Sequence, residues 1–288
     1  MDEEINESPL VSTEWLADRL DDPAVVIVHV LYEADIDDYS EGHIPGAHKK
    51  YWKEFLWDDM IREFPKPAEM SSRLGALGVD ENSTLVLYSG RNQYAIYGYW
   101  VTKILCGHPD VRVLDGHLKK WTLEGRALQS DTPAAAKPRI YTPQRELRDD
   151  SSRIGSIELR DALGQPGHVV LDGRYHSEYN GERVKPGTGF DFGAERWGRI
   201  PGARHLFFRD LFDDKDDTLL PPDGLEALYR GVGAAPDQAD AVVSYCRCGH
   251  RASLLWFAAT QLLGWDHIRV YDGSWTEWGS SVGFPVER

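Results

Sequence analysis

The stretch that decides the fold is Val242-Val-Ser-Tyr-Cys-Arg-Cys-Gly-His-Arg-Ala-Ser-Leu-Leu-Trp-Phe257. An apolar, β-branched run stops at Cys246, a cationic cluster with a glycine follows, and a second apolar run comes next. This order predicts a buried strand over Ala241–Tyr245, a short loop, and a buried helix over Ala252–Leu263 that Gly264 terminates. In sheets of parallel strands, ligands bind beyond the carboxyl ends of the strands. Cys246 occupies that position.

The same pattern occurs twice in the chain. Gly42-His-Ile-Pro-Gly-Ala47 returns as Gly198-Arg-Ile-Pro-Gly-Ala203, and Val113-Leu-Asp-Gly-His-Leu-Lys-Lys-Trp121 returns as Val270-Tyr-Asp-Gly-Ser-Trp-Thr-Glu-Trp278. Two unrelated patterns at nearly one offset indicate a tandem duplication. A Pro- and Ala-rich segment separates the copies. We therefore expect one domain over residues 8–130, a linker over 131–150 and a second domain over 151–288.

Short β-branched runs alternate with helical patterns in both copies. This alternation predicts an α/β protein in which each domain has a mainly parallel sheet with helices on both faces. The other expected strands are Val25–Val30, Thr84–Tyr88 and Val169–Asp172, and the other expected helices are Ser12–Leu20, Ala95–Leu105, Ile157–Leu163 and Gly224–Gly231.

The charge balance bears on partners and on location. The 288 residues include 47 acidic and 32 basic side chains, for a net charge of −15. Affinity for nucleic acid depends on Lys and Arg contacts to phosphate, so a general nucleic-acid binder is not expected. The acidic N-terminus lacks the apolar core of a secretory signal, and no apolar stretch approaches the ~18 residues of a membrane span. The sequence predicts a cytoplasmic protein with no membrane partner.

The surroundings of Cys246 favour a reactive thiolate. Arg247, His250 and Arg251 lie within five residues of it, and the start of a buried helix offers free N–H groups to an anion. Gly249 allows a tight turn that aims several of these N–H groups at one point. A buried structural cysteine is the alternative, but an apolar environment does not recruit two arginines. We therefore interpret Cys246 as a nucleophile.

A metal site is the alternative interpretation of this loop. Cys246-x-Cys248-x-His250 offers three ligands, whereas a structural zinc site usually needs four. The remaining cysteine, Cys106, belongs to the first copy, and the adjacent arginines would repel a cation. No metal and no cofactor are expected.

The first copy lacks these reactive groups. Aligning the two copies places Ser89 opposite Cys246, with Gln93 and Tyr94 in place of His250 and Arg251. No base and orienting group for a serine nucleophile can be located. We expect the first domain to be non-catalytic.

Taken together, these motifs resemble the tandem-domain rhodanese family, the sulfurtransferases. The resemblance rests on the two repeats, on the six-residue loop Cys246-Arg-Cys-Gly-His-Arg251, and on Asp172-Gly-Arg174 with Glu178 beyond it. It implies two rhodanese-like domains and a ping-pong transfer of sulfane sulfur through a persulfide on Cys246.

The resemblance also implies roles for further residues. The loop would bind the sulfur donor, Asp172 and Arg174 would support it from behind, Ser274 would lend a hydroxyl, and His43 of the first domain would contact the cleft. The donor-binding residues are Arg247, Cys248, Gly249, His250, Arg251 and Ala252.

Two departures from the family pattern concern the donor. Relatives that use thiosulfate often have lysine where this chain has Cys248, and some have arginine where Glu178 stands. The branch that uses mercaptopyruvate has an uncharged loop, which this chain lacks. We expect thiosulfate as the small-molecule donor, with 3-mercaptopyruvate second, and cyanide or a thiol as acceptor. Cys248 is either a resolving thiol or a bystander.

Two functions other than sulfur transfer are alternatives. A rhodanese-like phosphatase would need a Cys-x5-Arg loop, whereas Arg251 gives Cys-x4-Arg, which makes a smaller cradle. A non-catalytic rhodanese-like binding module is the other, because fold alone does not fix function.

Overall fold

The computed structural model describes residues 8–32, 38–131, 136–182 and 194–288. The chain forms two compact units, Met1–Asp150 with Asp213–Leu219, and Ser151–Phe212 with Leu220–Arg288. The short segment Asp213–Leu219 is tied to the first unit by ion pairs of Lys119 with Asp217 (3.0 Å) and Lys120 with Asp216 (2.8 Å).

The described part of the predicted linker, residues 136–150, also packs on the first unit. The Arg139 N–H donates to the Gly75 carbonyl (2.9 Å), and the Tyr141 hydroxyl lies 2.5 Å from Nδ1 of His108. This segment therefore extends the first unit rather than standing apart from it.

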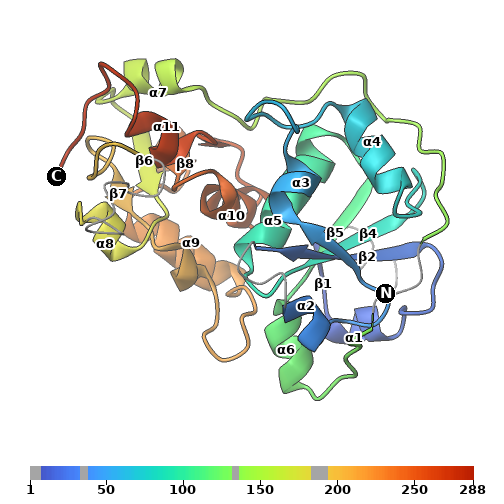
Figure 1. Ribbon diagram of the computed structural model, residues 1–288. Coiled ribbons are helices and arrows are strands. Elements are labelled where there is room, and N and C mark those ends of the chain that lie inside the picture. The colour runs from blue at the N-terminus through green and yellow to red at the C-terminus, as the bar shows by residue number, and fades with distance from the viewer. Residues whose placement is uncertain (1–7, 33–37, 132–135, 183–193) are drawn as a thin grey trace. The chain divides into compact units, whose positions relative to one another are not determined.

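The first unit is built on five parallel strands in the order β1-β5-β4-β2-β3 (Figure 1). The apolar runs at β2 and β4 form the centre of this sheet, because they are buried on both faces. The strands are β1 Leu10–Val11, β2 Val25–Leu31, β3 His48–Tyr51, β4 Thr84–Tyr88 and β5 Asp110–Leu114.

Helices cover both faces of the first sheet (Figure 1). Leu16 of α1 and Trp121 of α6 pack against Ile27 and Val86 on one face, whereas α5 packs against β2 and β4 from the other. The helices are α1 Thr13–Ala17, α2 Asp38–Glu41, α3 Trp52–Leu56, α4 Pro67–Gly75, α5 Gln93–Tyr99, which continues as the π-helical segment Trp100–Leu105, and α6 His117–Leu123.

The second unit repeats this plan with four parallel strands in the order β7-β6-β8-β9. Leu159 of α7 and Trp278 of α11 pack with Val243 on one face, and α10 packs against β8 from the other. The strands are β6 His168–Asp172, β7 Arg204–His205, β8 Ala241–Tyr245 and β9 Ile268–Val270. The helices are α7 Ser156–Ala162, α8 His176–Tyr179, α9 Pro222–Gly231, α10 His250–Phe257 and α11 Ser274–Trp278, with a 3-10 turn at Phe208–Leu211 and a π-helical segment at Ala258–Leu262.

The duplication extends to individual hydrogen bonds. In the first unit the Ile44 N–H donates to the Tyr88 hydroxyl (3.0 Å), and in the second the Ile200 N–H donates to the Tyr245 hydroxyl (3.2 Å). The repeated Ile-Pro-Gly-Ala turn is thus anchored to the last residue of the central strand in each unit.

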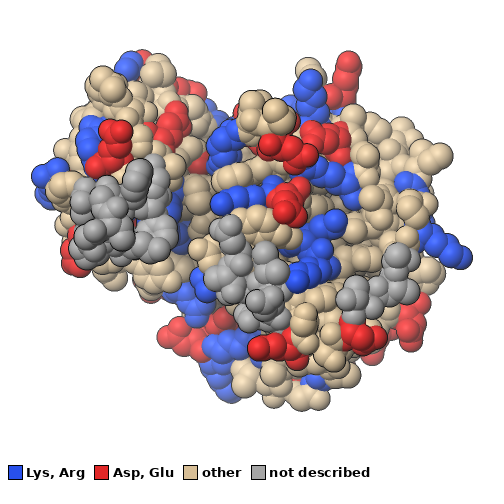
Figure 2. All heavy atoms as spheres, in the orientation of Figure 1, with Lys and Arg blue, Asp and Glu red and all other residues tan. Residues whose placement is uncertain are grey.

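The predicted fold class is confirmed, since both units have parallel sheets flanked by helices. Within the described ranges, no helix is both long and apolar enough to cross a membrane. On the face shown in Figure 2, acidic and basic side chains are interspersed over both units.

Candidate active site

Cys246 lies where the sequence predicts, directly after β8, and the helix after it starts at His250 rather than at Ala252. Its side chain is fully buried in the second unit. Gly249 has a φ of 97°, in the left-handed region that favours glycine, and it directly precedes α10. The loop from Cys246 to Gly249 therefore makes a tight turn into the N-terminus of a buried helix.

The start of α11 fixes this loop from one side. The Trp275 N–H donates to the Cys246 carbonyl (3.1 Å), and the Thr276 N–H donates to the Arg247 carbonyl (3.0 Å). In a trans peptide the C=O of one residue and the N–H of the next point in opposite directions. The N–H groups of Arg247 and Cys248 consequently point away from α11.

Ser274 holds Cys246 at its backbone. The Cys246 N–H donates to Ser274 Oγ (3.0 Å), and the Ser274 hydroxyl donates to the Tyr271 carbonyl (2.8 Å). Oγ lies 4.0 Å from Sγ of Cys246. The hydroxyl proton is donated to the Tyr271 carbonyl rather than to Sγ, because the first contact is much shorter. Ser274 therefore acts on the Cys246 N–H and positions the start of the loop.

Glu178 is a carboxylate that sequence reasoning left without a role. It lies on α8, 6% exposed, and accepts from Arg251 at 2.8 Å and 3.4 Å. Although burial opposes ionisation, Arg251 and Arg247 outweigh it and lower the pKa of Glu178. Burial likewise works against the charge of Arg251, but Glu178 raises the pKa of Arg251. Both groups are charged in the folded protein.

The predicted donor-binding residues lie together on this loop and on the first turn of α10. Arg251 is 5% exposed, and its guanidinium carbon lies 5.5 Å from the Tyr175 ring centre and 5.6 Å from that of Phe208. Arg247 Nε is 3.7 Å from Glu178, and its side chain is 19% exposed. His250 and Ala252 are buried, and Cys248 is half-buried.

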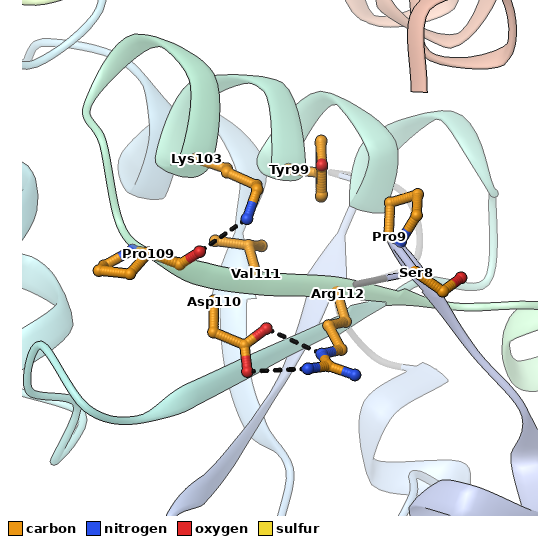
Figure 3. Close-up of a pocket in the computed structure, with 8 residues that line it drawn as sticks. All are labelled: Ser8, Pro9, Tyr99, Lys103, Pro109, Asp110, Val111 and Arg112. Atoms are coloured by element: carbon orange, nitrogen blue, oxygen red, sulfur yellow. Dashed lines mark hydrogen bonds and ion pairs between the residues drawn. The ribbon is translucent and has the colours of Figure 1, made fainter. Parts of the chain in front are cut away.

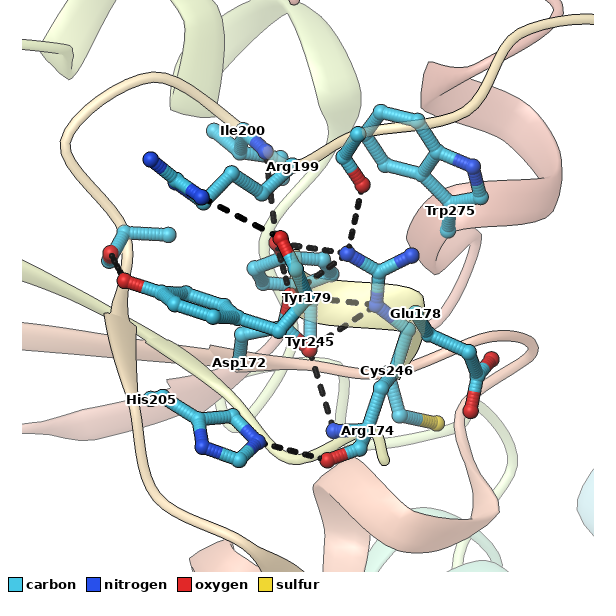
Figure 4. Close-up of polar contacts among 12 residues, drawn as sticks. Asp172, Arg174, Glu178, Tyr179, Arg199, Ile200, His205, Tyr245, Cys246 and Trp275 are labelled. Carbon is cyan, nitrogen blue, oxygen red and sulfur yellow. Dashed lines mark hydrogen bonds and ion pairs between the residues drawn. The ribbon is translucent and has the colours of Figure 1, made fainter. Parts of the chain in front are cut away.

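Asp172 and Arg174 form a buried ion pair behind the loop (Figure 4). Arg174 donates to both Asp172 oxygens, from Nε at 2.9 Å and from Nη2 at 2.6 Å. The Tyr245 hydroxyl donates to the same carboxylate (2.5 Å), and burial together with Asp172 raises the pKa of that hydroxyl. Since Tyr245 directly precedes Cys246, this network holds the end of β8.

The corresponding edge of the first unit has different chemistry. The Ser89 hydroxyl, opposite Cys246, donates to the Arg91 carbonyl (2.5 Å) and accepts from the Arg91 N–H (2.8 Å), so it closes a local turn. His43 is fully buried, with Nδ1 2.8 Å from the Tyr39 carbonyl and its ring stacked on that of Tyr39. His117 stands at the repeat position of Ser274, and like Ser274 it has a positive φ (49° and 52°).

His29 occupies the position of Asp172 in the sheet register, since His29 pairs with Tyr88 and Asp172 with Tyr245. Its ring stacks on Tyr88 at 4.4 Å, and burial, with smaller contributions from His43, His117 and Lys49, lowers the pKa of His29 to about 3. Burial also lowers the pKa of His117 to about 3, against the opposing influence of Asp217.

These buried histidines predict an acid-sensitive first unit. Unfolding exposes both rings to water, where they bind protons below a pKa of ~6.5, whereas the folded protein keeps them neutral. The contribution of these rings to the free energy of unfolding is therefore complete above that pH. It falls as the pH drops toward 3, by about 1.4 kcal/mol per pH unit for each ring. In urea unfolding at pH 7 and pH 5, His29→Phe should reduce the pH-dependent loss by about 2 kcal/mol.

His168, which is exposed, provides the control. His168→Phe should leave the difference between pH 7 and pH 5 as in the wild type. An unchanged difference in His29→Phe would show that His29 does not cause the acid sensitivity.

Cys106 illustrates a structural cysteine in the same chain. It is buried in the first unit, its sulfur lies 3.6 Å from the Pro65 carbonyl, and burial raises the pKa of its thiol to about 12. Arg148 and Arg145 oppose this effect but do not outweigh burial, so Cys106 remains a thiol.

A pocket of about 520 Å³ opens in the first unit beside β5 (Figure 3). Its charged groups are already engaged, because Lys103 donates to the Pro109 carbonyl (2.6 Å) and Arg112 pairs with Asp110 (2.8 Å). No cysteine lines it. We place the candidate active site at Cys246 instead.

Comparison with known proteins agrees with the duplication. The Rhodanese-like domain model matches residues 12–124 and again 157–281. The chain belongs to the rhodanese family, as a tandem of two such domains.

Full-length relatives resemble the chain at moderate identity. The "Sulfur carrier protein TtuD" of Thermus thermophilus is 36% identical, covering 97% of this chain and 96% of the relative. A protein of Saccharopolyspora erythraea named "Putative thiosulfate sulfurtransferase" is 37% identical, covering 98% and 97%. A solved anaerobic ergothioneine biosynthesis enzyme from Chlorobium limicola, with bound trimethyl histidine, is 26% identical with a TM-score of 0.78, covering 97% of this chain and 70% of that one.

Proposed function

We propose that this protein is a sulfurtransferase in which Cys246 carries sulfane sulfur as a persulfide, with thiosulfate as donor. The observation that carries the proposal is the buried Cys246 at the carboxyl end of β8, on a loop whose carbonyls bond to α11 and whose side chains include Arg247 and Arg251. A relative named for thiosulfate sulfurtransfer and another named as a sulfur carrier support the same chemistry.

The first half-reaction needs a thiolate and a good leaving group. The Cys246 thiolate attacks the outer sulfur of thiosulfate, the sulfur–sulfur bond breaks, and its electron pair leaves with sulfite. The persulfide anion then lies against the N–H groups of Arg247 and Cys248, which the α11 contacts turn away from that helix. These N–H groups stabilise the anion as an oxyanion hole stabilises oxygen.

The second half-reaction returns the enzyme to its starting state. The carbon of cyanide, or the sulfur of a thiol, attacks the outer sulfur of the persulfide, and the Cys246 thiolate leaves. Neither half-reaction requires a metal or an external oxidant. In this scheme Asp172, Arg174 and Tyr245 hold the end of β8, and Ser274 holds the first peptide of the loop.

The direct test is thiocyanate formation from thiosulfate and cyanide by the purified chain. We expect turnover that follows ping-pong kinetics, with parallel lines in double-reciprocal plots. Absence of turnover with thiosulfate and also with 3-mercaptopyruvate would instead favour a non-catalytic binding module.

Cys248 is expected to be a bystander in this cycle. A Cys246–Cys248 disulfide would require facing Cβ atoms two residues apart in a tight turn, and it would displace the N–H groups that receive the persulfide. Cys248→Ser should therefore retain at least about half of the wild-type turnover, because only the loop backbone has to be preserved.

Peptide mass spectrometry after thiosulfate loading distinguishes the two roles of Cys248. A loss of about 2 Da from the peptide that holds both cysteines, absent in Cys248→Ser, would establish a disulfide and a resolving role. If the peptide gains the mass of one sulfur in the wild type and also in Cys248→Ser, Cys248 is a bystander.

A further inference from the structure

We infer that Glu178 determines charge specificity, and that it disfavours doubly charged sulfur donors relative to singly charged ones. The inference rests on the sulfurtransferase function proposed above and concerns the substrate class of the same site. Thiosulfate remains the proposed donor, and Glu178 reduces its advantage over a sulfur donor with one negative charge, such as 3-mercaptopyruvate.

The ion pairs of the loop carry this inference. Arg251 lies 2.8 Å from Glu178, and Arg247 lies 3.7 Å from the same carboxylate. The two cations that the sequence assigns to the donor are therefore already shared with an anion of the protein. Counted with the Cys246 thiolate, the four groups have no net charge.

Burial makes the carboxylate effective at this position. Glu178 is 6% exposed and Arg251 is 5% exposed, so little water screens them. Burial works against the charge of Arg251, whereas Glu178 and, less strongly, Cys246 raise the pKa of Arg251. In Figure 4 the Glu178 carboxylate and the Cys246 sulfur both lie at the lower right of the residues drawn as sticks.

Aromatic contacts keep Arg251 in this arrangement. Its guanidinium lies near the Tyr175 and Phe208 rings, and Glu178 is itself held by the Tyr175 N–H (3.2 Å). Arg251 therefore cannot leave Glu178 for an incoming donor without breaking several contacts. The carboxylate remains beside the loop while the donor binds.

The two donors differ in charge but give the same persulfide. Thiosulfate brings two negative charges and releases sulfite. From 3-mercaptopyruvate, which brings one, the Cys246 thiolate takes the sulfur as the carbon–sulfur bond breaks, the bond's electron pair leaves with the carbon, and the thiol proton ends on that carbon to give pyruvate. Since repulsion by a fixed carboxylate scales with donor charge, Glu178 affects thiosulfate twice as strongly in free energy.

The test is Glu178→Gln, which keeps a hydrogen-bond acceptor for Arg251 but removes the charge. We expect kcat/KM to rise about tenfold with thiosulfate and about threefold with 3-mercaptopyruvate, the square root of the first factor. Any change in the reactivity of Cys246 affects both donors alike and cancels in their ratio. A ratio that stays at the wild-type value, or shifts toward 3-mercaptopyruvate, would overturn the inference.

Three further variants keep the test decisive. Glu178→Asp retains the charge and should retain the wild-type ratio, and Glu158→Gln, which removes an exposed carboxylate paired with Arg269 (2.7 Å), should do the same. If Glu178→Gln does not fold, Glu178→Ala decides the matter, since it also removes the charge and its gain with thiosulfate should be the square of its gain with 3-mercaptopyruvate. Equal gains would overturn the inference. A wild type inactive with both donors would contradict the proposed function instead.

Discussion

Cys246→Ser is expected to lower thiocyanate formation from thiosulfate by at least about a thousandfold, to the uncatalysed rate, while the fold is preserved. A hydroxyl is close in size to a thiol, so the buried position after β8 is retained. It does not form a persulfide, however, and both half-reactions are lost together. Steady-state thiocyanate production, with circular dichroism as the check on folding, measures this outcome.

Ser89→Ala is the matched control for this loss. Ser89 stands at the same repeat position in the first unit, and its hydroxyl closes a local turn with Arg91. Its removal should leave turnover within about twofold of the wild type, because the Ser89 hydroxyl bonds to Arg91 within the first unit and contacts none of the described groups around Cys246. Substantial residual turnover in Cys246→Ser, or a large loss in Ser89→Ala, would contradict the assignment of the nucleophile.

Asp172→Ala is expected to produce the largest change in stability, a loss of about 3–5 kcal/mol. It leaves the Arg174 guanidinium, 2% exposed, without its carboxylate in the interior of the second unit. The Tyr245 hydroxyl loses the same partner, although it still accepts from Ile200. Denaturant unfolding at pH 7 measures the loss.

Two variants separate an unpaired charge from a simple loss of contacts. Asp172→Ala with Arg174→Met removes both charges and should recover part of the lost stability, since no buried ion remains unpaired. Glu158→Ala breaks an exposed ion pair and should change stability by less than about 1 kcal/mol. If the double variant is as unstable as the two single changes added together, the ion pair is not the cause.

The elements that the sequence predicts are those with a strong local signal. β2, β4, β6 and β8 are mainly apolar runs, buried over most of their length, and they form the centres of the sheets. By contrast, β3 consists of His48-Lys-Lys-Tyr51 and has no apolar pattern, and β1 has only two residues. These edge strands exist because a neighbouring strand pairs with them, which is a tertiary effect that local propensity does not carry.

The candidate site likewise has features that the local sequence predicts and one that it does not. The position of Cys246, the glycine turn and the helix after it follow from one continuous stretch of sequence. The Glu178–Arg251 pair joins residues 73 positions apart, so no local pattern reveals it. The sequence assigns Arg251 to the donor because charge near a nucleophile is visible there, whereas the partner of that charge is visible only after folding.

The most direct test of the central claim is the mass of Cys246 after the first half-reaction alone. Purified protein is mixed with thiosulfate without an acceptor, and released sulfite is quantified beside peptide mass spectrometry. We expect one sulfite per chain and a gain of about 32 Da on Cys246, removed by cyanide. Sulfite release without added mass on Cys246, or added mass on another residue, would contradict transfer through a Cys246 persulfide.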